Sequence, residues 1–329
     1  MNSRENYNPA ADGATPFELP VPAGCAGLRL DLALARLFPQ YSRNRLAHWV
    51  RTGQVTVDGR AARPRQKVRE GERIRLVAAP DAAETAHRAE AIPLEILYED
   101  DALAIINKPA GLVVHPGSGN WQGTLLNALL AHAPALAAIP RAGIVHRLDK
   151  DTSGLLVVAK TLEAQADLVR QLQDRTVRRE YLAVARGRVA RSGRVDAPIG
   201  RHPVQRTRMA VSARGKPAVT HYEVLERYPQ ATLLRCRLES GRTHQIRVHL
   251  ASLGHPLVGD ATYGRRGTIA FPRQALHAER LALRHPVTGK SMQWESAPPV
   301  DLRELIVALR HEADGRARSP VTGHRSRAS

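Results

Sequence analysis

Residues 143–160, GIVHRLDKDTSGLLVVAK, place Arg147, Asp149, Lys150 and Asp151 in one short turn between two runs of branched apolar residues. Apolar runs of this length predict buried strands, so the turn between them is expected to be held firmly. Two carboxylates that alternate with cations could act as acid or base on a substrate. They could equally close the turn by pairing with their neighbours, as many surface charges do.

A protease-like pair of carboxylates is the first specific hypothesis, because DTSG follows Lys150 and is similar to the signature of aspartic proteases. The chain holds no second copy of that signature. Cations beside Asp149 and Asp151 also favour ionised carboxylates, whereas a pair that shares a proton needs one neutral carboxyl group. What remains is an ionised carboxylate in an electropositive surrounding, a group suited to act beside a sugar or a base.

Metal and disulfide chemistry are disfavoured by the residue types. The histidines of GRTHQIRVHLASLGHP lack an acidic ligand three or four residues away, and the chain has only Cys25 and Cys236. Neither a zinc site nor a disulfide framework is therefore expected. The polar start, MNSRENYNPAADGATPFELP, lacks the apolar core of a signal peptide, and we expect a protein of the reducing cytoplasm.

The charge balance predicts a polyanionic partner. The 329 residues include 49 Lys and Arg against 31 Asp and Glu, a formal net charge of +18, and arginines recur along the whole chain. The sequence has no stretch of about 18 apolar residues, the length that a membrane span needs. Nucleic acid therefore fits the charge better than a membrane surface.

Two domains are expected within an α+β fold. Residues 1–27 read as a flexible segment, and residues 28–78 as a small basic module of two short helices and a short sheet. Arg43, Arg45 and Arg51 lie off the apolar stripe of its second helix, where they would face either RNA phosphates or solvent alone. Such a module before a larger domain resembles the S4 RNA-binding domain.

A linker is expected at residues 79–91, followed by a large domain at 92–310 with a mixed, mostly antiparallel sheet and flanking helices. Thr124 and Thr161 are expected to cap two of these helices. The last segment, residues 311–329, is basic and rich in Ser and Gly, and is expected to be disordered.

Several motifs resemble those of the RluA family of pseudouridine synthases, and the resemblance as a whole covers the chain from about Leu28 to Leu309. They are PRAGIVHRLDKDTSGLLVVAK, INKPAGLVVHPGSGN, REYLAV, RHPVQRTRMAV, GKPAVTHYEVLE, SGRTHQIRVHLASLGHPLVGD and RQALHAERLALRHPVTG. The stretch between Tyr263 and Leu276 is shorter than expected from the subfamily that carries an S4 domain, which concerns peripheral RNA contacts and leaves the catalytic set intact.

The resemblance implies a role for five residues. Asp149 matches the catalytic aspartate, Tyr181 the tyrosine that stacks on the target uracil, and Arg247 the arginine that pairs with that aspartate. Arg147 matches the side chain that fills the gap left by a flipped nucleotide, and Leu276 is expected to line the uracil pocket. Without the motifs, Tyr181 would be read as an ordinary strand aromatic and Leu276 as a core leucine. Arg247 would be read as a surface arginine on a helix capped by Thr243.

The implied reaction converts uridine to pseudouridine: the N1–C1′ bond breaks, the base turns, and C5 joins C1′. No cofactor or metal is implied. Asp149 could attack C1′, add to the base, or remove the 2′ proton. The substrate implied is 23S rRNA or a precursor of the large ribosomal subunit, at uridines in the loop of helix 69, with the protein a monomer. The alternatives are another 23S or tRNA uridine, or a non-catalytic S4-type assembly factor.

Overall fold

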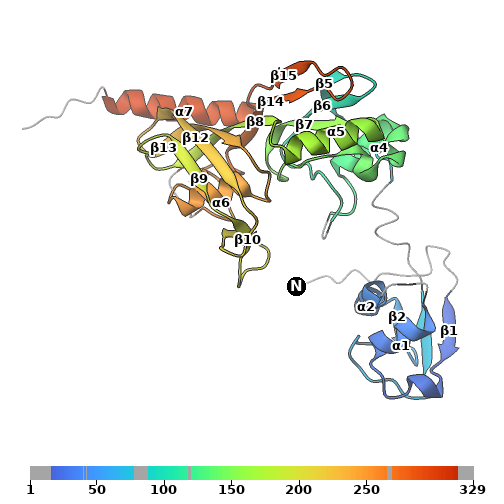
Figure 1. Ribbon diagram of the computed structural model, residues 1–329. Coiled ribbons are helices and arrows are strands. Elements are labelled where there is room, and N and C mark those ends of the chain that lie inside the picture. Colours follow the sequence, from blue (N-terminus) through green and yellow to red (C-terminus); the bar gives the residue numbers. More distant parts are fainter. Residues whose placement is uncertain are drawn as a thin grey trace, which may run out of the picture. The chain divides into compact units, whose positions relative to one another are not determined.

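The computed structural model describes residues 16–39, 41, 43–77, 88–117, 120–264 and 269–317. The chain divides into two compact units, Met1–Thr85 and Ala86–Ser329, and each is described by itself. Figure 1 shows the first unit in blue and the second in green to red. Each unit has its own apolar core, as two separate hydrophobic patterns in the sequence require.

The first unit packs two short helices on a small antiparallel sheet of strand order β1-β4-β2-β3. Apolar side chains at helical spacing, among them Leu30, Leu34, Leu46 and Trp49, are 2% exposed or less and meet alternating residues of the strands. The elements are β1 (Phe17–Pro20), α1 (Leu30–Leu37), α2 (Arg43–Arg51), β2 (Val55–Val57), β3 (Arg60–Ala61) and β4 (Arg73–Leu76).

The expected flexible segment before Leu28 is wrong for its described part. Strand β1 pairs antiparallel with β4, and a 3₁₀ turn follows at Ala23–Cys25. The reason is burial: Val21 and Cys25 lie in the core of the unit, and the Phe17 ring meets Phe38 edge-on at 5.8 Å. Residues 1–15 lie outside the described residues.

The second unit is built on a nine-stranded sheet of order β5-β6-β7-β14-β8-β13-β12-β9, with β15 also paired to β14. Only the β7–β14 pair is parallel among its described pairs, so the expected mixed, mostly antiparallel α+β fold is confirmed. The strands are β5 (Glu95–Glu99), β6 (Leu103–Lys108), β7 (Ser153–Ala159), β8 (Arg178–Arg186), β9 (Gly193–Asp196), β12 (Val219–Arg227), β13 (Ala231–Leu238), β14 (Leu276–Arg284) and β15 (Ser291–Glu295).

Helices cover both faces of this sheet. On one face, α4 and α6 contribute to a single large core with the side chains of β8 that alternate from Tyr181. On the other face, α5 packs on buried residues of β7, and α7 packs on Leu182 and Val184 of β8. These helices are α4 (Leu125–His132), α5 (Leu162–Gln173), α6 (Gln245–Ser252) and α7 (Val300–Ala317). A separate hairpin, β10 (Ile199–Arg201) and β11 (Met209–Val211), projects from the body in Figure 1.

The boundaries of the second unit differ from the expected ones. The Asn127 side chain donates to the Arg88 carbonyl at 2.8 Å, and the Glu90 carboxylate accepts from the Gly123 amide at 3.1 Å. The last residues of the expected linker are therefore bound to the second unit, while 78–87 lie outside the described residues. At the other end, α7 continues to Ala317, beyond the expected start of a disordered tail, and residues 318–329 are not described.

Candidate active site

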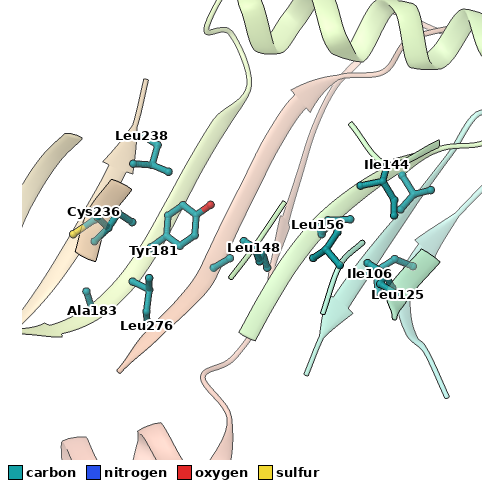
Figure 2. Close-up of a cluster of buried hydrophobic side chains, with 14 of the residues drawn as sticks. Ile106, Leu125, Ile144, Leu148, Leu156, Tyr181, Ala183, Cys236, Leu238 and Leu276 are labelled. Atoms are coloured by element: carbon teal, nitrogen blue, oxygen red, sulfur yellow. The ribbon is translucent and has the colours of Figure 1, made fainter. Parts of the chain in front are cut away.

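The turn that carries Asp149 is anchored by its apolar residue. Leu148 is 4% exposed and belongs to the large core, whereas Arg147 before it is exposed to solvent. Figure 2 shows Leu148 beside Tyr181, on the same side of the sheet. Because Leu148 is fixed in the core, the neighbouring Asp149 side chain is held at the surface of that core and stays 15% exposed.

Backbone carbonyls of the turn are held by cations from distant strands and loops. The Lys108 ammonium and the Gly111 amide both donate to the Lys150 carbonyl, at 2.9 Å each. The Arg273 guanidinium donates to the Asp151 carbonyl at 3.1 Å. These contacts fix the backbone on the C-terminal side of Asp149, so the turn does not depend on its own charged side chains for its shape.

Lys108 lies at the end of β6 and is completely buried. Its ammonium donates three hydrogen bonds, to the carbonyls of Pro109, Leu112 and Lys150, at 2.7 to 2.9 Å. Burial lowers the pKa of Lys108 to about 7, against the opposing charges of Asp151 and Asp149. Sequence reasoning gave Lys108 no role, although the NKP motif that contains it was recognised.

Arg247 joins the candidate catalytic aspartate to a second carboxylate. Its Nη1 donates to Asp149 at 3.0 Å, and its Nε and Nη2 donate to the two oxygens of Asp260 at 2.7 and 2.9 Å. Burial opposes the charge, but the hydrogen bonds and charges of Asp260 and Asp149 outweigh it and raise the pKa of Arg247. The bidentate pair with Asp260 fixes the guanidinium plane, which then presents Nη1 to Asp149.

Asp260 is the residue of the site that sequence reasoning missed. Its side chain is fully buried, and one carboxylate oxygen also accepts from the amides of Thr262 and Tyr263. Burial raises its pKa, but the hydrogen bonds and charge of Arg247 prevail and lower it. Asp260 is the last residue of the motif SGRTHQIRVHLASLGHPLVGD, but that motif alone assigned it no role. It follows Gly259, whose positive φ of 73° and close approach to the Arg273 carbonyl leave no room for a Cβ.

The helix that carries Arg247 does not begin as expected. Thr243 does not cap it; instead His244 stands at the N-cap in the left-handed region, and α6 starts at Gln245. The Gln245 side chain accepts from Ser240 and from the Arg242 amide, which secures the preceding loop. Arg247 is buried, as are all residues of α6 from Gln245 to Leu250, so protein covers this helix on all sides.

Tyr181 and Leu276 lie together in the large core, next to the Asp149 turn. Tyr181 on β8 is 5% exposed and Leu276 on β14 is 4% exposed. Their strands are paired, Leu276 opposite Ala183, and Figure 2 shows both side chains on one side of the sheet. Burial raises the pKa of Tyr181, so its ring presents a neutral, apolar face.

The three arginines that the sequence suggested for phosphate binding, Arg43, Arg45 and Arg51, belong to the first unit. Arg51 is exposed at the end of α2, and Arg43 is exposed but donates to Asp31 at 2.8 Å, together with Arg29 at 3.0 Å. The Arg45 side chain lies outside what the structure describes. Asp31 is buried, so Arg43 has a structural contact that the sequence pattern did not indicate.

Within the described residues, no three His, Cys, Asp or Glu side chains are placed to hold a metal ion. The same residues include no helix long and apolar enough to cross a membrane. The second unit offers a fixed carboxylate, that of Asp149, beside an aromatic ring and an apolar surface. That combination suits a base or nucleophile acting on a flat, neutral heterocycle.

The sequence is similar to known families of RNA-modifying and RNA-binding proteins. A family described as RNA pseudouridylate synthase matches residues 102–252, and the S4 domain family matches residues 28–74. Ribosomal large subunit pseudouridine synthase D of Nitrosomonas europaea is 59% identical over 94% of this chain and 90% of its own length. The protein of that name from Pseudomonas aeruginosa is 53% identical over 91% of this chain and 95% of its own.

Among solved structures, human RNA pseudouridylate synthase domain containing 1 is 28% identical, with a TM-score of 0.52. The match covers 68% of this chain and 96% of the human one. The expected resemblance and the S4-like first domain are thus confirmed. Taken with the carboxylate, the arginine and the tyrosine brought together in the second unit, these relatives establish that the chain belongs to the RluA family of RNA pseudouridine synthases.

Proposed function

We propose that this chain converts uridine to pseudouridine in 23S rRNA, at the loop of helix 69, with Asp149 as the catalytic carboxylate. Relatives at more than half identity are named ribosomal large subunit pseudouridine synthase D, which supports a large-subunit RNA substrate. The partner is then 23S rRNA or a precursor of the large subunit, in the cytoplasm, where ribosomes are assembled.

The observation that carries this proposal is the position of Arg247 between Asp149 and Asp260. A buried carboxylate costs free energy unless it is paired and hydrogen-bonded. Arg247 supplies that pairing to Asp149 from Nη1, while its Nε and Nη2 donate to Asp260. Asp149 therefore keeps oxygen lone pairs for the ribose or the base of a bound uridine.

The remaining residues have complementary roles in the proposal. Tyr181 stacks on the uracil, an interaction worth about 1–3 kcal/mol per base, and Leu276 lines the pocket. Exposed Arg147 fills the space that the flipped nucleotide leaves in the RNA. Flipping costs a few kcal/mol and least in a loop, which favours a hairpin loop as target. In the first unit, Arg43, Arg45 and Arg51 bind backbone phosphates.

Pseudouridine mapping in cells tests the substrate. The gene is deleted in its host and restored as wild type or as Asp149→Asn, and rRNA is read by carbodiimide treatment and primer extension. We expect stops in the loop of helix 69 to disappear on deletion and to return with wild type only. Stops lost at other uridines instead would reassign the substrate, and an unchanged map would favour a non-catalytic assembly factor.

A further inference from the structure

A histidine and a tyrosine complete a closed ring of contacts around Asp149 and Arg247. His244 Nδ1 lies 2.8 Å from the Tyr263 hydroxyl, and His244 Nε2 lies 3.9 Å from Oδ1 of Asp149. The other oxygen of Asp149, Oδ2, accepts from Arg247. The guanidinium carbon of Arg247 lies 5.1 Å from the centre of the Tyr263 ring. The two oxygens of Asp149 therefore face two different side chains.

The hydrogen bonds of Tyr263 determine which nitrogen of His244 carries the proton. The Tyr263 oxygen accepts from the Met209 amide at 2.9 Å. Its own hydrogen then needs an acceptor, and among the described residues His244 Nδ1 is the one recorded at hydrogen-bond distance. A neutral histidine that accepts at Nδ1 carries its hydrogen on Nε2, the nitrogen that faces Asp149.

The charge states agree with this arrangement. Burial raises the pKa of Tyr263, which keeps the phenol protonated as a donor. Burial also lowers the pKa of His244, although Asp149 and Asp260 oppose that shift while Arg247 and Arg147 add to it. Both directions favour a neutral imidazole that receives one hydrogen bond from Tyr263.

We propose that His244 is a positioning residue: its Nε2–H, fixed by Tyr263, orients the Oδ1 oxygen of Asp149 while Arg247 holds Oδ2. The separation of 3.9 Å shortens to a hydrogen bond when RNA closes the site, as catalytic hydrogen bonds often do on substrate binding. Asp149 then has both oxygens oriented before it reacts. This inference rests on the proposed catalytic role of Asp149.

Two substitutions at His244 separate the contact of Nε2 with Asp149 from the contact of Nδ1 with Tyr263. A glutamine amide reaches the place of Nε2 and keeps a donor toward Asp149, whereas an asparagine amide reaches the place of Nδ1 and keeps only the contact with Tyr263. The backbone at His244 has φ 56° and ψ 25°, a conformation that asparagine adopts more readily than glutamine. A purely structural role for this position would therefore favour His244→Asn.

The test measures the single-turnover release of tritium from 5-tritiated uridine RNA at saturating protein. We expect His244→Asn to lose about tenfold to a hundredfold in rate, the effect of losing one hydrogen bond to a charged group, while His244→Gln loses less than about fivefold. RNA affinity should be unchanged in both. An asparagine variant as fast as the glutamine variant, or faster, would overturn the proposal.

Tyr263→Phe provides the second arm, because it keeps the ring beside Arg247 and removes only the hydroxyl. In an otherwise wild-type chain we expect a loss of about tenfold, since the proton of His244 is no longer assigned to Nε2. In the His244→Asn background it should cause no further loss. Equal losses in both backgrounds would show that the pair does not act together. If Asp149→Asn itself stays active, the catalytic assignment fails first, so the two failures are distinguishable.

Discussion

The two units use positive charge in opposite ways. In the second unit, Lys108, Arg247 and Arg273 are at most 8% exposed and bind carbonyls or carboxylates of the protein itself. In the first unit, the Lys and Arg side chains that the structure describes between Arg36 on α1 and Arg75 on β4 are exposed, although Arg36 donates to the Gly24 carbonyl and Arg75 contacts Glu18. Buried cations need partners and so fix geometry, whereas exposed cations remain available for phosphates. In the function that we propose, the buried cations of the second unit shape the active site and the exposed cations of the first unit serve docking.

Arg43 departs furthest from this contrast, because its partner is a buried carboxylate. It is exposed, yet it donates to the buried carboxylate of Asp31, which Arg29 also contacts. Burial opposes ionisation of Asp31, but the hydrogen bonds from Arg43 and Arg29 prevail and lower its pKa. Arg43 therefore contributes less free charge to docking than its exposure alone indicates.

The largest loss is expected from Arg247→Lys. A single ammonium cannot hold Asp260 with two hydrogen bonds and Asp149 with a third, so the single-turnover rate should fall at least about a hundredfold. The control is Arg310→Lys, which alters an exposed bidentate pair with Glu226 and should leave the rate unchanged. A near wild-type rate for Arg247→Lys would remove the arginine from the catalytic set.

Removing the first unit should affect long RNA far more than short RNA. We expect the chain from Ala86 onward to keep its fold and its activity on a short hairpin, because its cores are its own and Arg88 and Glu90 are retained. On complete 23S rRNA, kcat/KM should fall about tenfold or more as phosphate contacts are lost. Equal efficiency on both RNAs would contradict a docking role for the first unit.

Asp260→Asn should destabilise the second unit in a pH-dependent way. Because the pKa of Asp260 is lowered in the folded protein, its contribution is complete above its ordinary value, near 4, and is lost as pH falls through the folded value. Urea unfolding at pH 7 should show a loss of about 3 kcal/mol relative to wild type, shrinking at pH 3. Asp101→Asn, at an exposed carboxylate, is the control. A difference that does not change with pH would argue against the buried ion pair.

The smallest effect is expected from replacing Arg43, Arg45 and Arg51 together by Gln. Each phosphate contact to a single strand contributes about 0.7 to the slope of log affinity against log salt, so the slope should flatten by about one to two. The single-turnover rate at saturation should stay the same. A slowed rate with an unaltered slope would move these arginines from docking to chemistry.

Much of the fold could be predicted from local patterns. Thr124 and Thr161 cap α4 and α5 as expected, each accepting from a backbone amide within the first turn. A capping threonine before an apolar helical repeat is a local signal. The start of α6 could not be predicted in that way, because His244 adopts the left-handed region to meet Tyr263, a contact made across 19 residues.

The site was only partly predictable for the same reason. Asp149 and Arg247 stand in motifs of the family, and the structure brings them together at 3.0 Å across 98 residues of chain. Asp260 ends the same motif as Arg247, but the motif does not indicate its role, which arises from the fold that buries it against Arg247. Residues that position a catalytic group are found through their contacts, and these exist only after folding.

The most direct test of the account compares Asp149→Asn with Asp151→Asn in single-turnover tritium release from 5-tritiated uridine RNA. The two carboxylates lie in one turn, but Asp149 is the one that Arg247 contacts, and the turn is held through the backbone carbonyl of Asp151. We predict no measurable release from Asp149→Asn, with RNA affinity retained, and nearly wild-type release from Asp151→Asn. Measurable turnover by purified Asp149→Asn would contradict the assignment of Asp149 as the catalytic carboxylate.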